Sequence, residues 1–361
     1  MKIGFLIKDL SSGGAERATV SLAGYFAEKG NDVEILTFVK GESFYPVSNK
    51  VKIKSIDFDE IEHGVSVKRL LGTIDRMIKL RKFIKAEKLD YLIGMSFSMT
   101  YYTVYTTAFT KTKSIGTERN NPYKYKASRL NTFLRKFFYR FTDGYVFQTV
   151  KSAKFFSKNA LNKGVVIPNA IYNTAIYDIE PPAEREKIIC AVGRLTEQKR
   201  FDLLIDAFNE IADKIPDYNL VIYGEGNLRE DLQKRIDDYS LTDRISLPGA
   251  TPEAYKPVSM ASVFVLSSDY EGMPNALMET MAMGVPCVST NCDMGPDELI
   301  ENGKSGILTA TGNSHELAQA ILSVVNDKKL AETLSQGGRK LLETNSIENI
   351  SQRWLDYLKT V

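Results

Sequence analysis

A chain of 361 residues with 43% apolar and 25% charged residues has the composition of a soluble globular protein and is long enough for about two domains. Only two histidines accompany its three cysteines, which excludes a zinc-ligand pattern and predicts reduced, structural thiols. The first apolar run ends at Lys8, too soon for a signal peptide, so we expect the chain to stay in the cytoplasm.

The net charge of +2 conceals an uneven distribution along the chain. Residues 1–170 hold 29 Lys and Arg against 15 Asp and Glu, a net charge of +14. The remainder holds 18 against 30, a net charge of −12. This division predicts two surfaces with different partners, one of which is anionic.

The chain opens on a strand, a glycine-rich turn, a helix and a second strand. Residues 1–36 show this plan first, with the helix ending at Gly30, and residues 187–227 repeat it with a different loop. Two such units at the start of two halves predict two doubly wound parallel sheets. Function is then expected in the loops beyond the carboxyl ends of the strands.

Residues 91–110 carry no charge, so this stretch has to be weighed as a membrane span. Its five Thr and two Ser make it too polar for hydrocarbon. A buried strand followed by a helix explains the stretch better.

The domain boundaries follow from proline content and periodicity. A polar, weakly periodic segment contains Pro181 and Pro182 and is typical of a linker. Near the C-terminus Ile350, Trp354 and Leu358 recur every four residues, which predicts a helix with one apolar stripe. We predict an N-terminal domain at 1–170, a linker at 171–186, a C-terminal domain at 187–345 and a C-terminal helix at 346–361.

Glycine-rich loops after the first strands of both halves suit a phosphorylated ligand. Gly13 and Gly14 let the backbone approach a ligand at a helix N-terminus, which favours an anion, although a simple tight turn explains them equally well. In the second half Gly193 leaves room beside Arg194 and Lys199. A planar guanidinium and a compact ammonium form a pair suited to a diphosphate.

Two further features of the second half carry weaker signals. Arg200, next in the same loop, fits a solvated surface charge as well as a ligand contact. Gly224 and Gly226 close a strand before a helix, where a nucleotide could lean on the loop.

The stretch DYEGMPNALMETMAMGVP places two carboxylates eight residues apart around a helix start. The pattern predicts a helix over Pro274–Met283 that stops at Gly284. Glu279 then lies about one turn inside the helix, and Glu271 lies in the preceding loop. A favourable helix dipole explains either carboxylate singly. It does not explain Gly272 and the exposed backbone between them, which are typical of a phosphate cradle.

Taken in this order and spacing, the segments SSGGAER, IPNAI, GRLTEQKR, YGEGNLR and the E-x7-E element resemble the retaining glycosyltransferases of family 4 over essentially the whole chain. The resemblance implies the GT-B fold: two facing Rossmann-like domains, with the C-terminal helix crossing back to the N-terminal one. It also implies a UDP-sugar donor, transfer of a hexose or N-acetylhexosamine, and no metal or other cofactor.

The resemblance also assigns roles to individual residues. Glu271 would lie by the donor sugar, and Arg194 and Lys199 would hold the diphosphate and stabilise the leaving group. Glu279 would bind the ribose hydroxyls, and Leu247 and Gly249 would hold the base through main-chain contacts. Other donor contacts are implied for Gly13, Gly14, Gly193, Gly272, Met273 and Asn275.

One segment departs from the family pattern. Where many relatives have a His that contacts the donor sugar, this chain has Arg119 within GTERNNP. Glu118, Arg119 and Asn120 then become candidate contacts to the sugar or the acceptor. No second carboxylate suited to a covalent nucleophile is evident, and the family analogy favours front-face displacement, in which the leaving phosphate takes the acceptor proton.

The basic half predicts contact with an anionic surface. Residues 123–141 hold six basic residues among seven aromatics, and residues 67–88 are also rich in Lys and Arg. This composition suits peripheral binding to the inner face of the cell membrane, although helices with a core face and a solvated basic face are the alternative. The general layout and the GESFY segment most resemble transferases that extend a glycan on undecaprenyl diphosphate. No nucleic-acid-binding motif accompanies the basic residues.

Two alternatives of other classes remain open from the sequence. Nucleotide-sugar epimerases and sugar phosphorylases share the fold, and a non-catalytic partner subunit could bind a sugar nucleotide without turning it over. The E-x7-E element argues against the first, and the intact Arg194, Lys199, Glu271 and Glu279 argue against the second.

Overall fold

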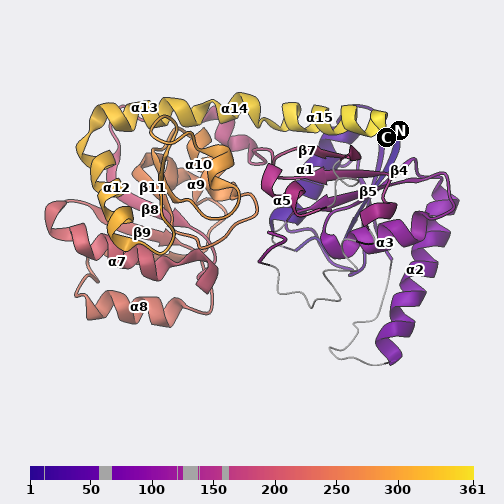
Figure 1. The fold of residues 1–361 in the computed structure, drawn as a ribbon, viewed down its shortest axis with the longest axis horizontal. Coiled ribbons are helices and arrows are strands. Elements are labelled where there is room, and N and C mark those ends of the chain that lie inside the picture. The colour runs from indigo at the N-terminus through magenta and orange to yellow at the C-terminus, as the bar shows by residue number, and fades with distance from the viewer. Residues whose placement is uncertain (12, 57–66, 120, 125–136, 138, 157–161) are drawn as a thin grey trace. The chain divides into compact units, whose positions relative to one another are not determined.

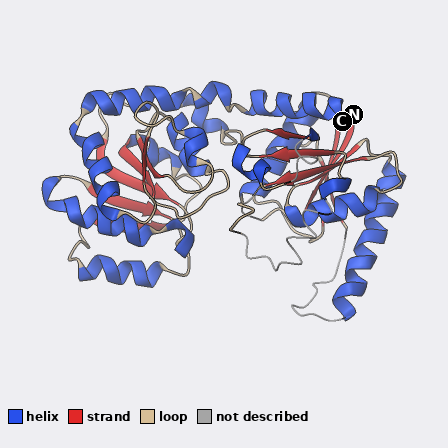
Figure 2. Cartoon of the chain, in the orientation of Figure 1, coloured by secondary structure: helices blue, strands red, loops and turns tan. Residues whose placement is uncertain are grey.

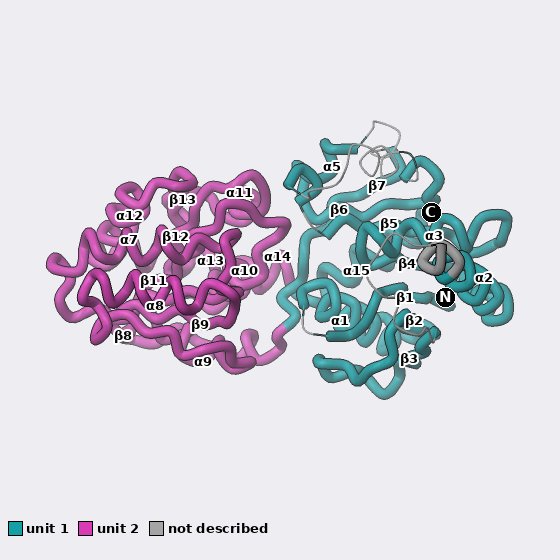
Figure 3. Tube along the Cα trace, turned by 90° about the horizontal axis from the view of Figure 1, so that it is seen from below, with its two compact units in different colours: residues 1–172, 346–361 teal, residues 173–345 magenta. Residues whose placement is uncertain are grey.

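The structure is a computed structural model that describes the chain apart from residues 12, 57–66, 120, 125–136, 138 and 157–161. It divides into two compact units (Figure 3). Unit 1 comprises Met1–Tyr172 together with Ser346–Val361, and unit 2 comprises Asn173–Asn345. Each unit is built on a parallel sheet covered by helices (Figures 1 and 2), which confirms the predicted fold class.

Unit 1 contains, in its described part, a seven-stranded sheet of order β3-β2-β1-β4-β5-β6-β7 in which every neighbouring pair is parallel. The strands are β1 (Lys2–Ile7), β2 (Asp32–Thr37), β3 (Lys52–Ser55), β4 (Tyr91–Gly94), β5 (Lys113–Glu118), β6 (Gly144–Phe147) and β7 (Gly164–Val166). The helices are α1 (Gly14–Glu28), α2 (Val67–Glu87), α3 (Phe97–Thr107), α5 (Val150–Lys154), α15 (Ile347–Thr360) and the short 3-10 helix η1 (Tyr139–Phe141).

Local sequence signals explain several element boundaries in unit 1. α1 ends at Glu28, and Gly30 follows with a φ of +83°, a conformation that glycine adopts without steric cost. The uncharged stretch 91–110 forms β4 and α3, as predicted. Ser96 caps α3 by accepting a hydrogen bond from the Met99 amide.

The C-terminal helix α15 belongs to unit 1, as the fold resemblance implied. Its predicted stripe of Ile350, Trp354 and Leu358 is buried in the core formed with α1 and β1. The Tyr91 hydroxyl donates to the Leu358 carbonyl at 2.6 Å, which fixes the end of the helix to β4. Trp354, the one tryptophan of the chain, is therefore a probe of unit 1.

A charged cluster holds the first three strands of unit 1 to the end of α2. Glu87 accepts hydrogen bonds from Lys2 at 2.6 Å and from Lys54 at 2.7 Å. The fully buried carboxylate of Glu34 lies beneath, 3.9 Å from the Lys2 ammonium and 3.5 Å from that of Lys54. The hydrogen bonds from the two lysines lower the pKa of Glu87 to about 2.

Unit 2 contains a six-stranded parallel sheet of order β10-β9-β8-β11-β12-β13. The strands are β8 (Glu186–Val192), β9 (Asn219–Tyr223), β10 (Ile245–Gly249), β11 (Ala261–Leu266), β12 (Cys287–Thr290) and β13 (Ile307–Thr309). The helices are α7 (Phe201–Ile211), α8 (Arg229–Asp238), α9 (Tyr255–Met260), α10 (Asn275–Ala282), α11 (Pro296–Leu299), α12 (Ser314–Asn326), α13 (Lys328–Arg339) and α14 (Leu341–Thr344), with 3-10 helices η2 (Thr174–Asp178), η3 (Glu197–Lys199) and η4 (Ala212–Lys214).

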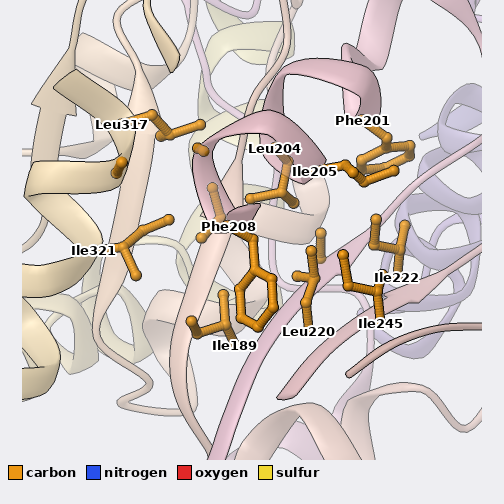
Figure 4. Close-up of a cluster of buried hydrophobic side chains, with 14 of the residues drawn as sticks. Ile189, Phe201, Leu204, Ile205, Phe208, Leu220, Ile222, Ile245, Leu317 and Ile321 are labelled. Atoms are coloured by element: carbon orange, nitrogen blue, oxygen red, sulfur yellow. The ribbon is translucent and has the colours of Figure 1, made fainter. Parts of the chain in front are cut away.

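The core of unit 2 forms where α7 and α12 cover one face of the sheet (Figure 4). Phe201, Leu204, Ile205 and Phe208 recur with the helical period and give α7 one apolar face. The residues that they join in the cluster include Ile189, Leu220, Ile222, Ile245, Leu317 and Ile321. This packing fixes the start of α7, and with it the preceding loop after β8.

The chain passes between the units at Tyr172 and Asn173, and the rest of the segment 171–186 belongs to unit 2. Two arginines hold this segment in place. Arg339 donates to the Ile179 carbonyl at 2.9 Å, and Arg185 donates to the Ser259 and Ala261 carbonyls at 3.0 and 3.1 Å. The segment expected as a linker is thus packed against unit 2, through these hydrogen bonds to backbone carbonyls and through the fully buried Ile176.

The three cysteines are free and buried, as predicted. Burial raises the pKa of the Cys190 and Cys287 thiols well above the usual range and that of Cys292 to about 12. Within the described residues, no helix is both long enough and apolar enough to cross a membrane.

Candidate functional site

The carboxyl ends of β8 and β11 meet where the strand order of unit 2 reverses. The chain runs from β8 to β9 and β10 on one side, then returns to β11, β12 and β13 on the other. Ligands of open parallel sheets bind outside the carboxyl ends of strands at such a switch point. The loop after β8 (residues 193–200) and the loop after β11 (residues 267–274) lie here, and they carry all three predicted catalytic residues.

Lys199 and Glu271 form an ion pair across this switch point. The Lys199 Nζ lies 2.7 Å from the Glu271 Oε1, and the Ser268 hydroxyl donates to the same oxygen, also at 2.7 Å. Their side chains are only 16% and 8% exposed, so both charges are largely withdrawn from water. Because an ammonium group has three donors, Lys199 can bind an anionic ligand while it holds Glu271.

Three further hydrogen bonds join the same two loops. The Asp269 amide donates to the Gln198 carbonyl at 2.9 Å, and the Gln198 side chain donates to the Tyr270 carbonyl at 2.8 Å. The Ser267 hydroxyl donates to the Lys199 carbonyl at 2.7 Å. The backbone on both sides of the ion pair is therefore fixed before any ligand binds, which limits the reorganisation that binding requires.

Glycines in unit 2 make room for the protein's own side chains and backbone. A Cβ on Gly193 would lie 3.2 Å from the Lys199 Cε, so this glycine lets the lysine stem pass, as the sequence suggested. A Cβ on Gly224 would lie 1.8 Å from the Gly193 carbonyl oxygen, and one on Gly226 would lie 2.3 Å from that of Leu195. Gly224 and Gly226 thus allow the loop after β9 to pack on the loop after β8.

The helix that contains Glu279, α10, begins one residue later and ends one residue earlier than predicted, at Asn275–Ala282. Pro274 is its N-cap, and Gly284 follows its end with a φ of +73°. Gly295, with a φ of +91°, packs under the helix start, where a Cβ would lie 2.5 Å from the Pro274 Cδ and 2.8 Å from the Gly272 carbonyl oxygen. This glycine sets the path of the segment between Glu271 and α10.

The residues around α10 that are predicted to contact the donor take the local positions expected from the sequence. Gly272 is half-buried in the loop, Met273 is buried, and half-buried Asn275 opens the helix. Glu279 is half-buried one turn inside. Amide groups in the first turn of a helix have no partner within it and favour an anion at this end.

The remaining predicted site residues of unit 2 do not all lie on the two loops that carry the ion pair. Arg194 lies on the loop after β8 with an exposed side chain. Leu247 and Gly249 end the edge strand β10, two strands from β8. Their carbonyls accept hydrogen bonds from Arg229 at 2.6 Å and from the Gly224 amide at 2.9 Å.

In unit 1, Gly13 is the N-cap of α1 and Gly14 is its first residue. The Arg17 amide donates to the Gly13 carbonyl at 3.0 Å. A Cβ on Gly13 would lie 2.1 Å from the Glu16 Oε2, so the Glu16 carboxylate occupies the space beside this glycine. A carboxylate of the protein thus lies at the helix start, where a ligand's anion was expected.

The described residues of GTERNNP, the segment that departs from the family pattern, form hydrogen bonds within unit 1. Glu118 is buried at the end of β5, and the Tyr139 hydroxyl lies 3.4 Å from its Oε2. The Arg119 guanidinium donates to the Asn169 side chain at 2.8 Å and to the Tyr172 hydroxyl at 3.4 Å. Asn120 lies outside the described residues. Substrate contacts of Glu118 and Arg119 stay a prediction.

Several residues that build the site were not singled out from the sequence. Ser268 and Asp269 directly follow the apolar run of β11, and a polar pair at that place is the signal that could have indicated them. Gln198 gave no such signal, because its partner Tyr270 lies 72 positions away in the chain. Within the described part of the chain, no group of three or more His, Cys, Asp or Glu residues is arranged to hold a metal ion.

Two family models match the chain in succession. The model described as Glycosyltransferase Family 4 matches residues 12–172, and the one described as Glycosyl transferases group 1 matches residues 174–341. Their boundary falls at the division between the two units.

Among curated proteins, the chain is 27% identical to a Campylobacter jejuni enzyme, GalNAc-alpha-(1->4)-GalNAc-alpha-(1->3)-diNAcBac-PP-undecaprenol alpha-1,4-N-acetyl-D-galactosaminyltransferase, over 100% of this chain and 99% of that one. It is 26% identical to the Rhizobium meliloti lipopolysaccharide core biosynthesis glycosyltransferase LpsE, over 96% of both chains.

Solved structures show the same fold. Anabaena HepE in complex with UDP superposes with a TM-score of 0.84 at 17% identity, over the full length of both chains. TarM superposes with a TM-score of 0.80 at 17% identity, over 99% of this chain and 98% of that one. The chain is therefore a glycosyltransferase of the GT-B, family-4 type.

Proposed function

We propose that this glycosyltransferase moves a hexose or N-acetylhexosamine from a UDP-sugar to a glycan carried on undecaprenyl diphosphate, with retention of the anomeric configuration. The observation that carries the proposal is the Lys199–Glu271 ion pair at the switch point of unit 2, just before the start of α10. HepE, which shares the fold, was solved with UDP and with UDP-glucose, which supports the donor class. The activity named for the Campylobacter relative supports the acceptor class.

The site suits a leaving nucleoside diphosphate. Negative charge develops on the diphosphate as the glycosidic bond breaks, and fixed cations and amide dipoles lower the energy of that state. Lys199 supplies a cation that is already held in place, and exposed Arg194 would supply a second from the same loop. The start of α10 adds the positive end of a helix dipole.

In this proposal Glu271 and Glu279 contact different parts of the donor. Glu271, held by Lys199 and Ser268, would face the sugar through its remaining acceptor sites, because a carboxylate has about four lone-pair sites and two are used. Glu279 would bind the ribose hydroxyls from inside the helix. Leu247 and Gly249 would hold the base, and Gly13, Gly14, Gly193, Gly272, Met273 and Asn275 would contact the donor through backbone groups.

Retention would follow front-face displacement rather than a covalent enzyme intermediate. In that reaction the acceptor hydroxyl attacks on the face that the diphosphate leaves, and its proton passes to the leaving phosphate. The protein then needs no general base of its own and no metal ion. Its task is to hold donor and acceptor together and to stabilise the leaving group.

The acceptor and the membrane would both meet the basic half of the chain. Residues 1–170 carry a net charge of +14, which complements a diphosphate-linked lipid. On α2, the exposed residues Ile74, Ile78, Lys82 and Lys85 share one face and combine apolar side chains with positive charge. Such a face suits the headgroup layer of an anionic membrane, so we place the enzyme at its cytoplasmic face. Residues 125–136 and 138 of the basic aromatic stretch lie outside the described part.

The proposed reaction is tested by incubating the protein with a panel of UDP-sugars and membrane extracts. We expect UDP release that depends on the extract, and a lipid-linked product heavier by one sugar in mass spectrometry. UDP release without acceptor would favour an epimerase or phosphorylase. Transfer only to soluble acceptors, unaffected by lipid or salt, would refute the lipid-linked acceptor.

Membrane binding is tested by flotation with vesicles. Wild-type protein is expected to float with vesicles that contain phosphatidylglycerol, less at high salt, and not with phosphatidylcholine alone. Ile78→Ser, which removes an exposed apolar side chain from α2, should weaken flotation. Tyr239→Ser, which removes an exposed aromatic residue from unit 2, should not. Equal flotation of both variants would refute contact through α2.

A further inference from the structure

Arg200 adopts a backbone conformation that is costly for its residue type. Its φ of 49° and ψ of 44° lie in the left-handed region, where every residue other than glycine is strained. The residue ends η3, which carries Lys199, and caps α7, where the Leu203 amide donates to its carbonyl at 3.0 Å. A glycine would make this reversal of direction without cost, so the side chain of Arg200 has to compensate for the conformation.

The guanidinium of Arg200 joins two carboxylates from different elements. Its Nε lies 3.1 Å from the Asp202 Oδ1, in the first turn of α7. Its Nη1 lies 3.1 Å from the Asp269 Oδ1, in the loop after β11. The side chain is 29% exposed, so Arg200 is not the solvated surface charge that the sequence allowed. A planar fork can serve two carboxylates at once, which a lysine ammonium does less well.

The Arg200–Asp269 ion pair lies next to the Lys199–Glu271 ion pair on both loops. Arg200 directly follows Lys199, and Asp269 precedes Glu271 by two residues. The loops are thus joined twice, by Lys199–Glu271 and by Arg200–Asp269. Without the guanidinium, the carboxylates of Asp202 and Asp269 would face each other uncompensated, and like charges would push the loop after β11 away from α7.

We propose that Arg200 is a positioning residue, which holds Lys199 and Glu271 at the separation that the donor diphosphate requires. The proposal rests on the proposed function for the identity of the ligand. It does not make Arg200 a contact of the substrate, because its guanidinium is occupied by Asp202 and Asp269. A displacement of about 1 Å at such a site is enough to lower a rate about 100-fold.

The first test measures the loops without any ligand. Hydrogen–deuterium exchange of residues 267–272 is compared in wild type, Arg200→Gln and Arg235→Gln. Arg235 pairs with Asp206 between α8 and α7, so its substitution removes an ion pair of the same kind away from the site. We expect faster exchange in Arg200→Gln alone. Unchanged exchange in Arg200→Gln would overturn the proposal whether or not the protein binds UDP.

The second test measures UDP affinity by calorimetry in wild type, Arg200→Gln, Lys199→Ala and the double variant. We expect Arg200→Gln to weaken binding about 10-fold in the wild-type background and less than about 2-fold when Lys199 is already absent, because the effect passes through Lys199. Arg200→Lys should remain weakened, and Arg235→Gln should bind as wild type does.

The outcomes separate this proposal from the proposed function. Wild-type protein that does not bind UDP would refute the donor assignment and leave the exchange result to decide on Arg200. Wild-type affinity in Arg200→Gln would overturn the positioning role, as would a 10-fold loss that persists in the Lys199→Ala background. Full recovery in Arg200→Lys would show that charge alone suffices and that the fork is not needed.

Discussion

Lys199 and Glu271 are 72 positions apart in the sequence, yet the ammonium of one lies 2.7 Å from the carboxylate of the other. The parallel order of unit 2 produces this contact, because β8 and β11 are neighbours with their carboxyl ends together. The pair therefore marks the place in the sheet where a ligand is expected.

Replacing Lys199 by Ala is expected to abolish most transfer without unfolding unit 2. Glu271 keeps its hydrogen bond from Ser268, and the backbone bonds between the two loops remain. Loss of one fixed donor to a developing charge lowers kcat by about 100-fold or more. Steady-state rates are compared with those of Lys187→Ala, which removes an exposed ion pair to Asp217 in the same unit. Equal rates in both variants would remove Lys199 from the mechanism.

Two glycine substitutions separate backbone strain from displacement of the helix start. Gly295→Ala would bring a methyl group 2.5 Å from the Pro274 Cδ and shift the segment before α10. Gly312 also has a positive φ, +72°, but a Cβ there meets nothing within 4 Å. Both variants should lose about 1 kcal/mol of stability from backbone strain.

Only Gly295→Ala should also lose transfer activity, by about 10-fold or more, since in the proposed function the start of α10 binds the donor. Thermal unfolding and initial rates measure the two effects separately. If Gly295→Ala keeps the activity of Gly312→Ala, the start of α10 does not position the donor.

The sequence predicts the elements that depend on local patterns. Gly30 and Gly284 end helices as expected because left-handed turns need glycine, and the stripe of α15 is read directly from its period. The loop position of Glu271 and the helical position of Glu279 also follow from Pro274 and Gly284.

Local sequence patterns did not predict the contacts between segments that are far apart in the chain. Gly224 and Gly226 gave only a weak signal for a loop on which a nucleotide could lean, and in the structure they make room for the backbone of Gly193 and Leu195. A glycine signals close approach without indicating what approaches. The left-handed conformation of Arg200 gave no signal either, because the pairing that compensates for it is with Asp269, 69 positions away in the sequence. The packed state of residues 173–186 depends in the same way on Arg185 and Arg339.

Because of the charged cluster, we expect the free energy of unfolding of unit 1 to depend on pH. The pKa of Glu87 is about 2 in the folded chain against a usual value of 4.5. Its stabilising contribution is therefore complete above about pH 4.5 and is lost as the pH falls toward 2.

Glu87→Gln should thus lower the Tm of unit 1 at pH 7, and the difference from wild type should vanish by about pH 2. The fluorescence of Trp354 follows unit 1 alone. Asp75→Asn, which removes an exposed pair within α2, should change the Tm little at any pH. A difference for Glu87→Gln that stays constant from pH 7 to pH 2 would contradict this assignment.

The buried thiols should be inert in the native protein. Only the thiolate attacks a disulfide reagent, and burial raises the pKa of all three cysteines far above neutral pH. We expect no reaction with Ellman's reagent at pH 8 and the release of three equivalents after unfolding in guanidinium chloride. Rapid reaction of one native thiol would show that its surroundings open in solution.

The anomeric configuration of the product shows whether the enzyme transfers the sugar with retention, as proposed. NMR of the new glycosidic bond formed by wild type is compared with the configuration in the UDP-sugar, and Glu271→Gln is assayed alongside. Glu271→Gln is close to the native side chain in size but removes the charge that pairs with Lys199. The proposed reaction requires the donor configuration in the wild-type product and a rate at least about 100-fold lower for Glu271→Gln. An inverted product, or wild-type rates in Glu271→Gln, would contradict it.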